Sequence, residues 1–403
     1  MICINEILQK ARDVTFKDLL SIFGFLIALP ISFVFKIRHP DLWLICEDEK
    51  EARDNGYWFF KYVRENHSEQ DVAYAINFNS PDYKKISKLG RVIQFGSLKH
   101  WVYYLTASKN ISSQKGGKPN AALCYVLEVL TGLLKKQRIF LGHGITINDA
   151  KWLYYDNTKF SLFLCGAKKE KEYVEKKFGY PRGSVQYFGI PRMDNLHNFK
   201  VIKNQILVMP SWRAWLIKPS ENNNGIVPIF KQTDYYKKWQ EFLNHNKLSS
   251  YLSDNNLRLI FYPHRECQRF LNSFDITSKQ IILANDKDYD IQQLLKDSAL
   301  MITDYSSVFM DFIYMKKPVI FYQFDSEEFF IRQYQEGWFN YKNNIFSSIA
   351  YNLNELMRIL NFYAKISFTI SDEFKMNHNE IFPLYDSYNS KRLFDYLKHK
   401  KLE

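Results

Sequence analysis

Four short polar segments of this 403-residue chain combine residue types that could bind or transfer a phosphate group. The first is Gly142-His143-Gly144, whose glycines allow a sharp turn that leaves the imidazole exposed. A histidine titrates near neutral pH, so His143 could remove the proton from an attacking hydroxyl group. Taken alone, however, this segment favours a turn in which the histidine only makes a structural hydrogen bond.

Two further segments carry cationic side chains that suit phosphate. The segment from Ser211 to Arg213 offers a planar, permanently charged guanidinium group, although a surface arginine beside a packed tryptophan is the alternative. In the segment around His264, Arg265 and Glu266, the first two side chains could bind phosphate oxygens and Glu266 could bind a ribose or a base. A solvated charged loop explains Arg265 and Glu266 equally well.

The fourth segment runs from Asp304 through Ser306 and Ser307 into a helical pattern. Free backbone N–H groups, the helix dipole and two hydroxyl groups would converge there on one point, which is a favourable anion site. A plain helix N-cap is the alternative, but one serine would satisfy it. Two adjacent serines after an aspartate therefore favour phosphate binding.

An acidic Asp286-x-Asp288 pattern offers a competing hypothesis, because such pairs hold a divalent metal in many nucleotide-sugar transferases. Its alternative is an acidic start to the helix expected near Ile291. We expect no metal ion and no cofactor, since Arg213 and Arg265 could neutralise a diphosphate instead.

The elements that would position these segments alternate between short apolar runs and helical patterns, which predicts βαβ units and mainly parallel sheets. The expected strands are Leu42–Cys46, Val72–Phe78, Val92–Phe95, Arg138–Leu141, Leu162–Cys165, Val185–Phe188, Gln205–Met209, Leu257–Tyr262, Gln280–Leu283, Leu300–Thr303 and Val319–Tyr322. The expected helices between and after them are Tyr57–Glu65, Ala121–Leu134, Ala167–Phe178, Tyr235–Asn244, Ile291–Lys296, Ser307–Tyr314, Leu353–Tyr363 and Ser390–His399.

Two doubly wound α/β domains that face a cleft are the simplest architecture for this series. We expect an N-terminal apolar segment at residues 1–40, a first α/β domain at 41–200 and a second α/β domain with C-terminal helices at 201–403. In such sheets ligands bind at the carboxyl ends of the strands. All four polar segments follow an expected strand, as a functional site requires.

The composition limits the class of partner. A net charge of +12 favours anionic partners such as phosphates, acidic lipid headgroups or nucleic acid. Nucleic acid is the weakest choice, because no zinc-finger spacing, RNA-recognition signature or basic heptad region is present. The five scattered cysteines include no Cys-x-x-Cys pair, which argues against disulfides and zinc and fits a reducing compartment.

Residues Leu19–Phe35 form an uncharged apolar stretch that is followed by Lys36 and Arg38. A buried first helix and a monotopic anchor in the membrane interface explain it about equally well. A spanning helix fits less well, because the stretch is short and contains Pro30.

The polar segments together resemble the CDP-glycerol glycerophosphotransferase family, which includes teichoic acid primases, polymerases and related capsule enzymes. The order and rough spacing match from about residue 40 to 330. The most specific block is Thr303–Ser307 with the following Asp311 and Lys317-Pro318. The remaining matches are Gly142–Gly144, Gly189–Asp194, Pro210–Arg213 and His264, with a further likeness at Asn55–Phe59.

The resemblance implies a GT-B-like fold with peripheral, monotopic attachment to the cytoplasmic face of the cell membrane. It implies CDP-glycerol as donor, bound mainly by the domain at 201–403, a lipid-linked disaccharide or polyol-phosphate as acceptor on the side of the domain at 41–200, and no essential metal. From the sequence patterns above, we expect no nucleic acid as a partner. The expected catalytic residues are His143 and His264. The expected substrate-binding residues are Ser211, Arg213, Arg265, Asp304, Ser306 and Ser307.

The hypothesis is therefore a transfer of glycerol phosphate with release of CMP, in which His143 deprotonates the acceptor hydroxyl. A ribitol-phosphate or nucleotide-sugar transferase of the same fold is one alternative. A non-catalytic scaffold for polymer assembly is another, and it predicts that replacing His143 leaves turnover unchanged.

Overall fold

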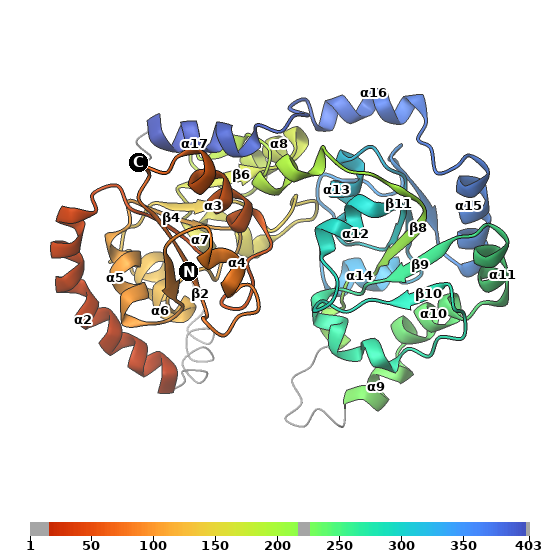
Figure 1. Ribbon diagram of the computed structural model, residues 1–403, viewed down its shortest axis with the longest axis horizontal. Coiled ribbons are helices and arrows are strands. Elements are labelled where there is room, and N and C mark those ends of the chain that lie inside the picture. The colour runs from red at the N-terminus through yellow and green to blue at the C-terminus, as the bar shows by residue number, and fades with distance from the viewer. Residues whose placement is uncertain (1–15, 217–225, 400–403) are drawn as a thin grey trace. The chain divides into compact units, whose positions relative to one another are not determined.

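The computed structural model describes residues 16–216 and 226–399. The chain forms two compact units, each built around one parallel sheet (Figure 1). Unit 1 comprises Met1–Gly144, Lys151–Asp194 and Asp386–Glu403, and unit 2 comprises Ile145–Ala150 and Asn195–Tyr385. This division assigns the C-terminal segment from Asp386 to unit 1 and the short segment Ile145–Ala150 to unit 2, and it does not separate residues 1–40 from unit 1.

The sheet of unit 1 has seven parallel strands in the order β3-β2-β1-β4-β5-β6-β7. The order reverses between β1 and β4, which is the kind of switch point where α/β sheets bind ligands. The strands are β1 Trp43–Ile45, β2 Val72–Ile76, β3 Val92–Gln94, β4 Lys109–Ser112, β5 Arg138–Phe140, β6 Leu162–Cys165 and β7 Val185–Tyr187.

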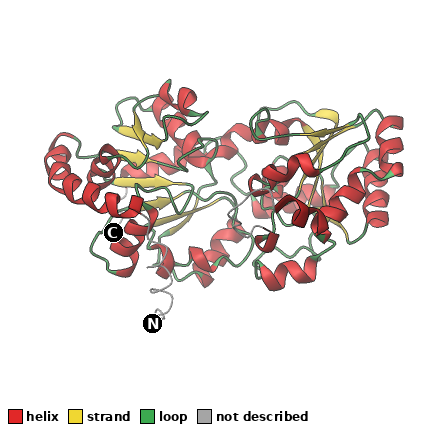
Figure 2. Cartoon of the chain, turned by 90° about the horizontal axis from the view of Figure 1, so that it is seen from below, coloured by secondary structure: helices red, strands yellow, loops and turns green. Residues whose placement is uncertain are grey.

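Helices cover both faces of this sheet, as the α/β crossovers require (Figure 2). They are α2 Phe16–Arg38, α3 Asn55–Asn66, α4 Tyr83–Ser87, α5 Leu98–Thr106, α6 Ala121–Tyr125, α7 Tyr155–Thr158, α8 Lys168–Lys177 and α17 Asn389–His399. A π-helical turn, Val126–Leu130, follows α6, and short 3₁₀ turns lie at Lys151–Leu153 and Pro191–Leu196.

The sheet of unit 2 has six parallel strands in the order β10-β9-β8-β11-β12-β13. Its strands are β8 Ile202–Met209, β9 Arg258–Phe261, β10 Ile281–Leu283, β11 Ser298–Thr303, β12 Val319–Tyr322 and β13 Ser347–Ala350. Its helices are α9 Ile226–Gln232, α10 Asp234–Leu243, α11 Asn246–Asp254, α12 Ile291–Asp297, α13 Phe309–Tyr314, α14 Ser326–Arg332, α15 Leu353–Lys365 and α16 Asp372–Ile381, with 3₁₀ segments at Ala214–Leu216 and Arg265–Ser273.

Each sheet is fixed by an apolar core. In unit 2, α10, α11 and α15 bury one continuous cluster against the strands, and the Trp239 ring packs against Tyr322 at 5.3 Å between centroids. In unit 1, α5 is the centre of a second cluster, in which Trp101 and Tyr104 are fully or almost fully buried. These cores hold the carboxyl ends of the strands, and the loops after them, in register.

Strand β4 was not expected from the sequence, although it lies in the middle of the sheet between β1 and β5. Its sequence Lys-Asn-Ile-Ser is neither an apolar run nor an alternating pattern, yet all four residues are buried. Two of the polar residues donate hydrogen bonds to nearby backbone. Asn110 donates to the carbonyl of Tyr104 at 3.2 Å, and the Ser112 hydroxyl donates to the carbonyl of Gln114 at 2.7 Å. A pattern of apolar periodicity does not identify a strand whose polar residues are buried in this way.

The apolar N-terminal stretch forms α2. One face of this helix packs against α5, and most of its apolar surface is exposed. Ala28 is buried, and the Trp101 indole donates to the Ser21 hydroxyl at 3.2 Å. In contrast, Phe23, Phe33 and Ile37 are 64%, 68% and 81% exposed. The simple alternative of a buried core helix therefore does not fit. By length and composition alone, Leu20–Arg38 is apolar enough to cross a membrane.

Candidate active site

The loop after β5 presents His143 at the carboxyl edge of the sheet in unit 1. Gly142 adopts a φ of 72°, a left-handed conformation that glycine accepts without strain. The turn leaves the His143 side chain 69% exposed, as expected from the sequence. Its Nδ1 atom lies 2.5 Å from Oδ2 of Asp54, a residue at the N-cap of α3.

This contact sets the tautomer and the charge of the imidazole. A carboxylate only accepts hydrogen bonds, so the proton of neutral His143 lies on Nδ1 and leaves Nε2 as a proton acceptor. The charge of the Asp54 carboxylate, together with its hydrogen bond, also raises the pKa of His143 above its ordinary value. The Gln114 Nε2 atom, from the loop after β4, lies 2.8 Å from the same Nδ1 atom, but both atoms are donors when Nδ1 carries the proton for Asp54, so Gln114 does not hydrogen-bond to Nδ1 in this tautomer.

Asp54 is held by its neighbour Asn55 and by Arg192, which lies in a third segment of the chain. Its Oδ1 atom accepts hydrogen bonds from Arg192 Nη1 at 3.0 Å and from the Asn55 N–H at 2.8 Å. Burial would raise the pKa of Asp54, but His143 and Arg192 together keep it below its ordinary value. The carboxylate is therefore ionised over the physiological range.

Asn55 and Arg192 also join the two loops to each other. The Asn55 side chain donates to the Gly142 carbonyl at 2.7 Å and accepts from the Arg192 N–H at 3.0 Å. Arg192 Nη1 donates to the His143 carbonyl at 2.5 Å. Three segments that are distant in the sequence therefore form one rigid arrangement around His143.

Sequence reasoning identified His143 but missed Asp54 and Gln114. Asn55 and Arg192 were included only as parts of segments that resemble the family. The one available signal for Asp54 was its position as an N-cap before the helical pattern of Asn55–Asn66, and an N-cap alone predicts nothing about a histidine 89 residues away.

In unit 2, three of the predicted substrate-binding residues form a buried network after β8 and β11. Asp304 Oδ1 accepts from the backbone N–H and the hydroxyl of Ser211 at 2.8 and 2.7 Å. Asp304 Oδ2 lies 2.9 Å from Arg213 Nη2. The other partner of Arg213 is Asp325, after β12, which accepts from Nε at 2.8 Å and from Nη2 at 3.0 Å.

This network differs from the prediction for Arg213. The guanidinium group is fully buried, and its Nη1 atom donates to the carbonyl and the hydroxyl of Ser211 and to the carbonyl of Trp212. All its nitrogens are thus engaged within the protein, and none is directed to solvent. Arg213, Ser211 and Asp304 join the loops after the strands, so in this structure they shape the turn rather than line a surface.

The turn shaped in this way carries Ser306 and Ser307, which are half-buried. The N-cap of α13 is Val308, and no side chain caps the helix. Within the described ranges, neither serine hydroxyl makes a hydrogen bond to the protein. The N-cap alternative therefore does not account for these serines, and both hydroxyls are available to a ligand.

His264, after β9, has the opposite tautomer to His143. Its Nδ1 atom accepts a hydrogen bond from the Glu266 N–H at 3.2 Å, so the proton of the neutral ring lies on Nε2. The ring stacks on Trp212 with centroids 6.0 Å apart, and its backbone N–H donates to the Pro210 carbonyl at 3.0 Å. The next residue, Arg265, is exposed.

The Asp286-x-Asp288 pattern forms a local turn. The Asn285 side chain donates to Asp288 Oδ2 at 2.7 Å and accepts from the Asp288 N–H at 2.9 Å. Asp290 caps α12 through the Gln293 N–H, as the helix-start alternative expected for this acidic run. Among the residues that the structure describes, no group of three or more His, Cys, Asp or Glu side chains could hold a metal ion.

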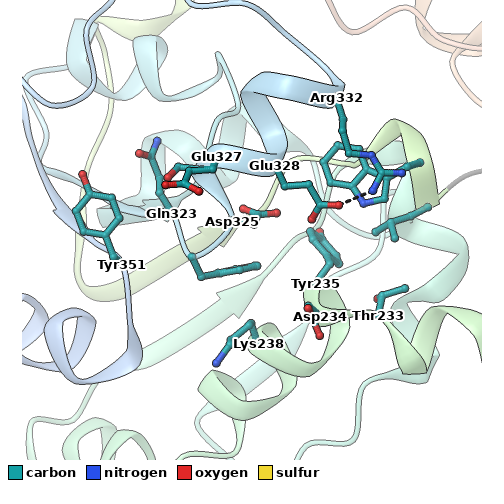
Figure 3. A pocket seen from close by; sticks show the side chains of 14 residues that line it. Thr233, Asp234, Tyr235, Lys238, Gln323, Asp325, Glu327, Glu328, Arg332 and Tyr351 are labelled. Carbon is teal, nitrogen blue, oxygen red and sulfur yellow. Dashed lines mark hydrogen bonds and ion pairs between the residues drawn. The ribbon is translucent and has the colours of Figure 1, made fainter.

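A cavity of about 650 Å³ opens in unit 2 beside this network (Figure 3). Its charged lining residues are Asp234, Asp325, Glu327, Glu328, Lys238 and Arg332. Four carboxylates against two cations disfavour a diphosphate there, and Glu328 is already paired with Arg332. The predicted phosphate-binding serines are not among its lining residues.

Comparisons with known proteins place the chain. It is 30% identical to the minor teichoic acid biosynthesis protein GgaB of Bacillus subtilis over 395 residues, which cover 96% of this chain and 43% of GgaB. It is 24% identical to the ribitol-phosphate polymerase TarL of Staphylococcus aureus over 168 residues, or 39% of this chain and 28% of TarL. The chain thus spans less than half of these relatives.

Solved structures share the fold. The wall teichoic acid polymerase TagF matches with a TM-score of 0.65 and 14% identity, over 95% of this chain and 96% of that one. A UDP-GlcNAc 2-epimerase from Methanocaldococcus jannaschii matches with a TM-score of 0.54 and 12% identity, over 89% and 100%. The expected GT-B-like fold is confirmed. Since the family model for CDP-glycerol:poly(glycerophosphate) glycerophosphotransferases matches residues 27–399, the chain belongs to that family of transferases.

Proposed function

We propose that this chain transfers glycerol phosphate from CDP-glycerol to a lipid-linked or polyol-phosphate acceptor, with release of CMP. The observation that carries the proposal is the contact of His143 Nδ1 with Asp54, which makes the exposed Nε2 atom a base. Among the relatives, GgaB is a teichoic acid biosynthesis protein, and a variant of TagF was soaked with CDPG.

In the proposed step, Nε2 of His143 takes the proton of an acceptor hydroxyl group. The hydroxyl oxygen forms a bond to the β-phosphorus, which carries the glycerol, and the bond from that phosphorus to the CMP oxygen breaks. The electron pair leaves with CMP, while the positive charge on His143 is balanced by Asp54. The step needs no redox partner.

Unit 2 supplies the groups that bind the donor in this proposal. Ser306 and Ser307 donate hydroxyl hydrogens to the diphosphate, and His264 donates its Nε2 proton to a phosphate oxygen. Arg265 is exposed and adds positive charge. Arg213 acts indirectly, because its buried ion pairs hold the turn that carries the serines.

The exposed face of α2 supports peripheral attachment to the inner leaflet of the membrane. Phe23 and Phe33 can enter the acyl boundary, while Lys36 and Arg38 in the last turn attract anionic headgroups. The acceptor, if it is lipid-linked, is confined to the same surface.

Ribitol phosphate is the second candidate for the transferred group. The likeness to TarL, a ribitol-phosphate polymerase, favours it over a nucleotide sugar. A comparison of donors decides between the two polyol phosphates.

The test incubates the purified protein with membranes and either CDP-glycerol or CDP-ribitol, in the presence of EDTA, and measures CMP. The variants are His143→Asn and a matched control, His39→Asn, since His39 also contacts an aspartate, Asp71, at 2.5 Å. We expect acceptor-dependent CMP from CDP-glycerol that persists in EDTA, survives in the control and is lost in His143→Asn.

Two results would contradict the proposal. Preference for CDP-ribitol would replace the donor but keep the chemistry. Equal CMP from His143→Asn and wild type would exclude His143 as the base, whereas no CMP from either donor would favour the scaffold alternative.

A further inference from the structure

A buried glutamate lies beneath the Asp54–His143 pair. Glu47 lies two residues after the end of β1 and is only 3% exposed. Its Oε2 atom accepts the backbone N–H groups of Arg53 at 3.0 Å and Asp54 at 3.2 Å. Its Oε1 atom accepts the N–H of Tyr57 at 2.6 Å. One side chain thus accepts three backbone N–H groups of the turn that leads into α3.

The backbone of this turn is pressed against the carboxyl group. A Cβ atom at Gly56 would lie 2.7 Å from Glu47 Cγ and 3.0 Å from Oε1, closer than real contacts allow. Glycine is therefore required at this position. The glycine and the glutamate form a matched pair, in which the missing side chain of one makes room for the other.

The position of Asp54 follows from this arrangement. Its backbone is held by Glu47, while its carboxylate contacts His143 through Oδ2 and Arg192 through Oδ1. The contact to His143 depends on the direction in which the short side chain leaves the turn. A shift of this turn by about 1 Å costs a catalytic group most of its effect.

We propose that Glu47 is a positioning residue for the reaction, and that it fixes the turn Arg53–Tyr57 so that Asp54 meets Nδ1 of His143. The inference rests on the proposed function only in taking His143 as the base. Glu47 itself touches neither substrate nor reacting atoms.

The electrostatics of the site agree with this role. Burial, and then the Asp54 carboxylate, raise the pKa of Glu47 to about 8. Glu47 is therefore ionised less readily than an exposed glutamate, while its two oxygens accept the three backbone N–H groups. Other ionisable groups facing this region are His143, Arg192 and Tyr74.

The test compares Glu47→Ala and Glu47→Gln with a matched control, Glu170→Gln. Glu170 is also a buried glutamate of unit 1, and it accepts backbone N–H groups of Gly166 and Ala167 at the start of α8. The first measurement is the imidazole pKa of His143 by NMR on histidine-labelled protein, with the signal assigned by its loss in His143→Asn. The second is kcat and KM for CMP release.

We expect Glu47→Ala to lose all three hydrogen bonds, to bring the pKa of His143 down toward its ordinary value, and to lower kcat by roughly tenfold or more with an unchanged KM for the donor. In Glu47→Gln the amide oxygen can still accept the N–H groups of Arg53 and Asp54, and only the bond from the Tyr57 N–H is lost. The changes in pKa and kcat should therefore be smaller than in Glu47→Ala. Glu170→Gln should leave the pKa of His143 unchanged.

Folded Glu47 variants with an unaltered His143 pKa would overturn the proposal. If Glu47→Ala does not fold, the same comparison on Glu47→Gln decides it. The NMR measurement needs no turnover, so absence of transferase activity in wild-type protein would refute the proposed function while leaving the role of Glu47 decided by the pKa.

Discussion

Replacement of Asp54 by asparagine should reverse the tautomer of His143. Two donors, Arg192 Nη1 and the Asn55 N–H, are directed at Oδ1. The asparagine oxygen must therefore occupy that side, and its NH₂ group must face Nδ1 of His143. An NH₂ group donates to Nδ1, so the proton of the neutral ring moves to Nε2 and the base is lost.

The magnitude follows from the groups that are lost. A positioned general base contributes about 10²–10⁴-fold, and a hydrogen bond to a charged group contributes about 1.5–3 kcal/mol, or roughly 10- to 150-fold. Because the His143 side chain is 69% exposed, water can reorganise around it and the lower end applies. We expect kcat to fall by about 10²-fold with little change in KM for the donor.

The pH profile gives a second readout. The Asp54 carboxylate raises the pKa of His143, so in wild type the imidazole stays protonated, and inactive as a base, to a higher pH. On the acidic side of the pH profile, wild-type activity should therefore rise at a pH above the ordinary histidine pKa. In Asp54→Asn the same rise should occur at a lower pH.

The assay is CMP release from pH 5.5 to 9, combined with ¹⁵N shifts of the imidazole that report the tautomer. Asp71→Asn, which alters the His39 contact, is the control and should match wild type. An Asp54→Asn protein with near wild-type kcat, or with the proton still on Nδ1, would refute the reasoning.

Three further predictions concern other parts of the chain. Arg213→Leu should lower the free energy of unfolding by about 3–5 kcal/mol in urea titrations, because two buried carboxylates lose their partner; a loss under about 1 kcal/mol would contradict this. Replacing Ser306 and Ser307 together by alanine should raise KM for CDP-glycerol about tenfold at an unchanged melting temperature; an unchanged KM would exclude them from donor binding. Replacing Phe23 and Phe33 together by serine should weaken binding to anionic vesicles by about 10²-fold, whereas equal binding would show that the face of α2 is not inserted.

Much of the fold could be predicted because its strands are short apolar runs between helical patterns. Leu162–Cys165 and Val319–Tyr322 match the expected bounds fully. The two missed strands fail for a physical reason: β4 and β13 carry the sequences Lys-Asn-Ile-Ser and Ser-Ser-Ile-Ala, which are neither apolar runs nor alternating patterns. For β4 the residues are buried because the strand pairs with both β1 and β5, and apolar periodicity does not encode that pairing.

For the candidate site, the sequence could supply only residue types and their positions after strands. A motif shows which side chains follow a strand, but it does not show how many of their hydrogen-bond donors are left for a ligand once the protein has folded. Arg213 illustrates the difference: its position after β8 suited a phosphate ligand, yet Asp304 and Asp325 come from two other strand ends and occupy it. Conversely, the hydroxyl groups of Ser306 and Ser307 could have capped α13, but the helix has Val308 at its N-cap and no side-chain cap, so capping does not engage either serine.

The two histidines show how local partners, rather than residue type, assign a role. His143 contacts a carboxylate through Nδ1, so its Nε2 accepts a proton. His264 receives a backbone N–H at Nδ1, so its Nε2 donates one. The proposed transfer needs both behaviours, a base for the incoming hydroxyl and a donor for the charge on phosphate. Different neighbours, by fixing opposite tautomers, would let one residue type serve both.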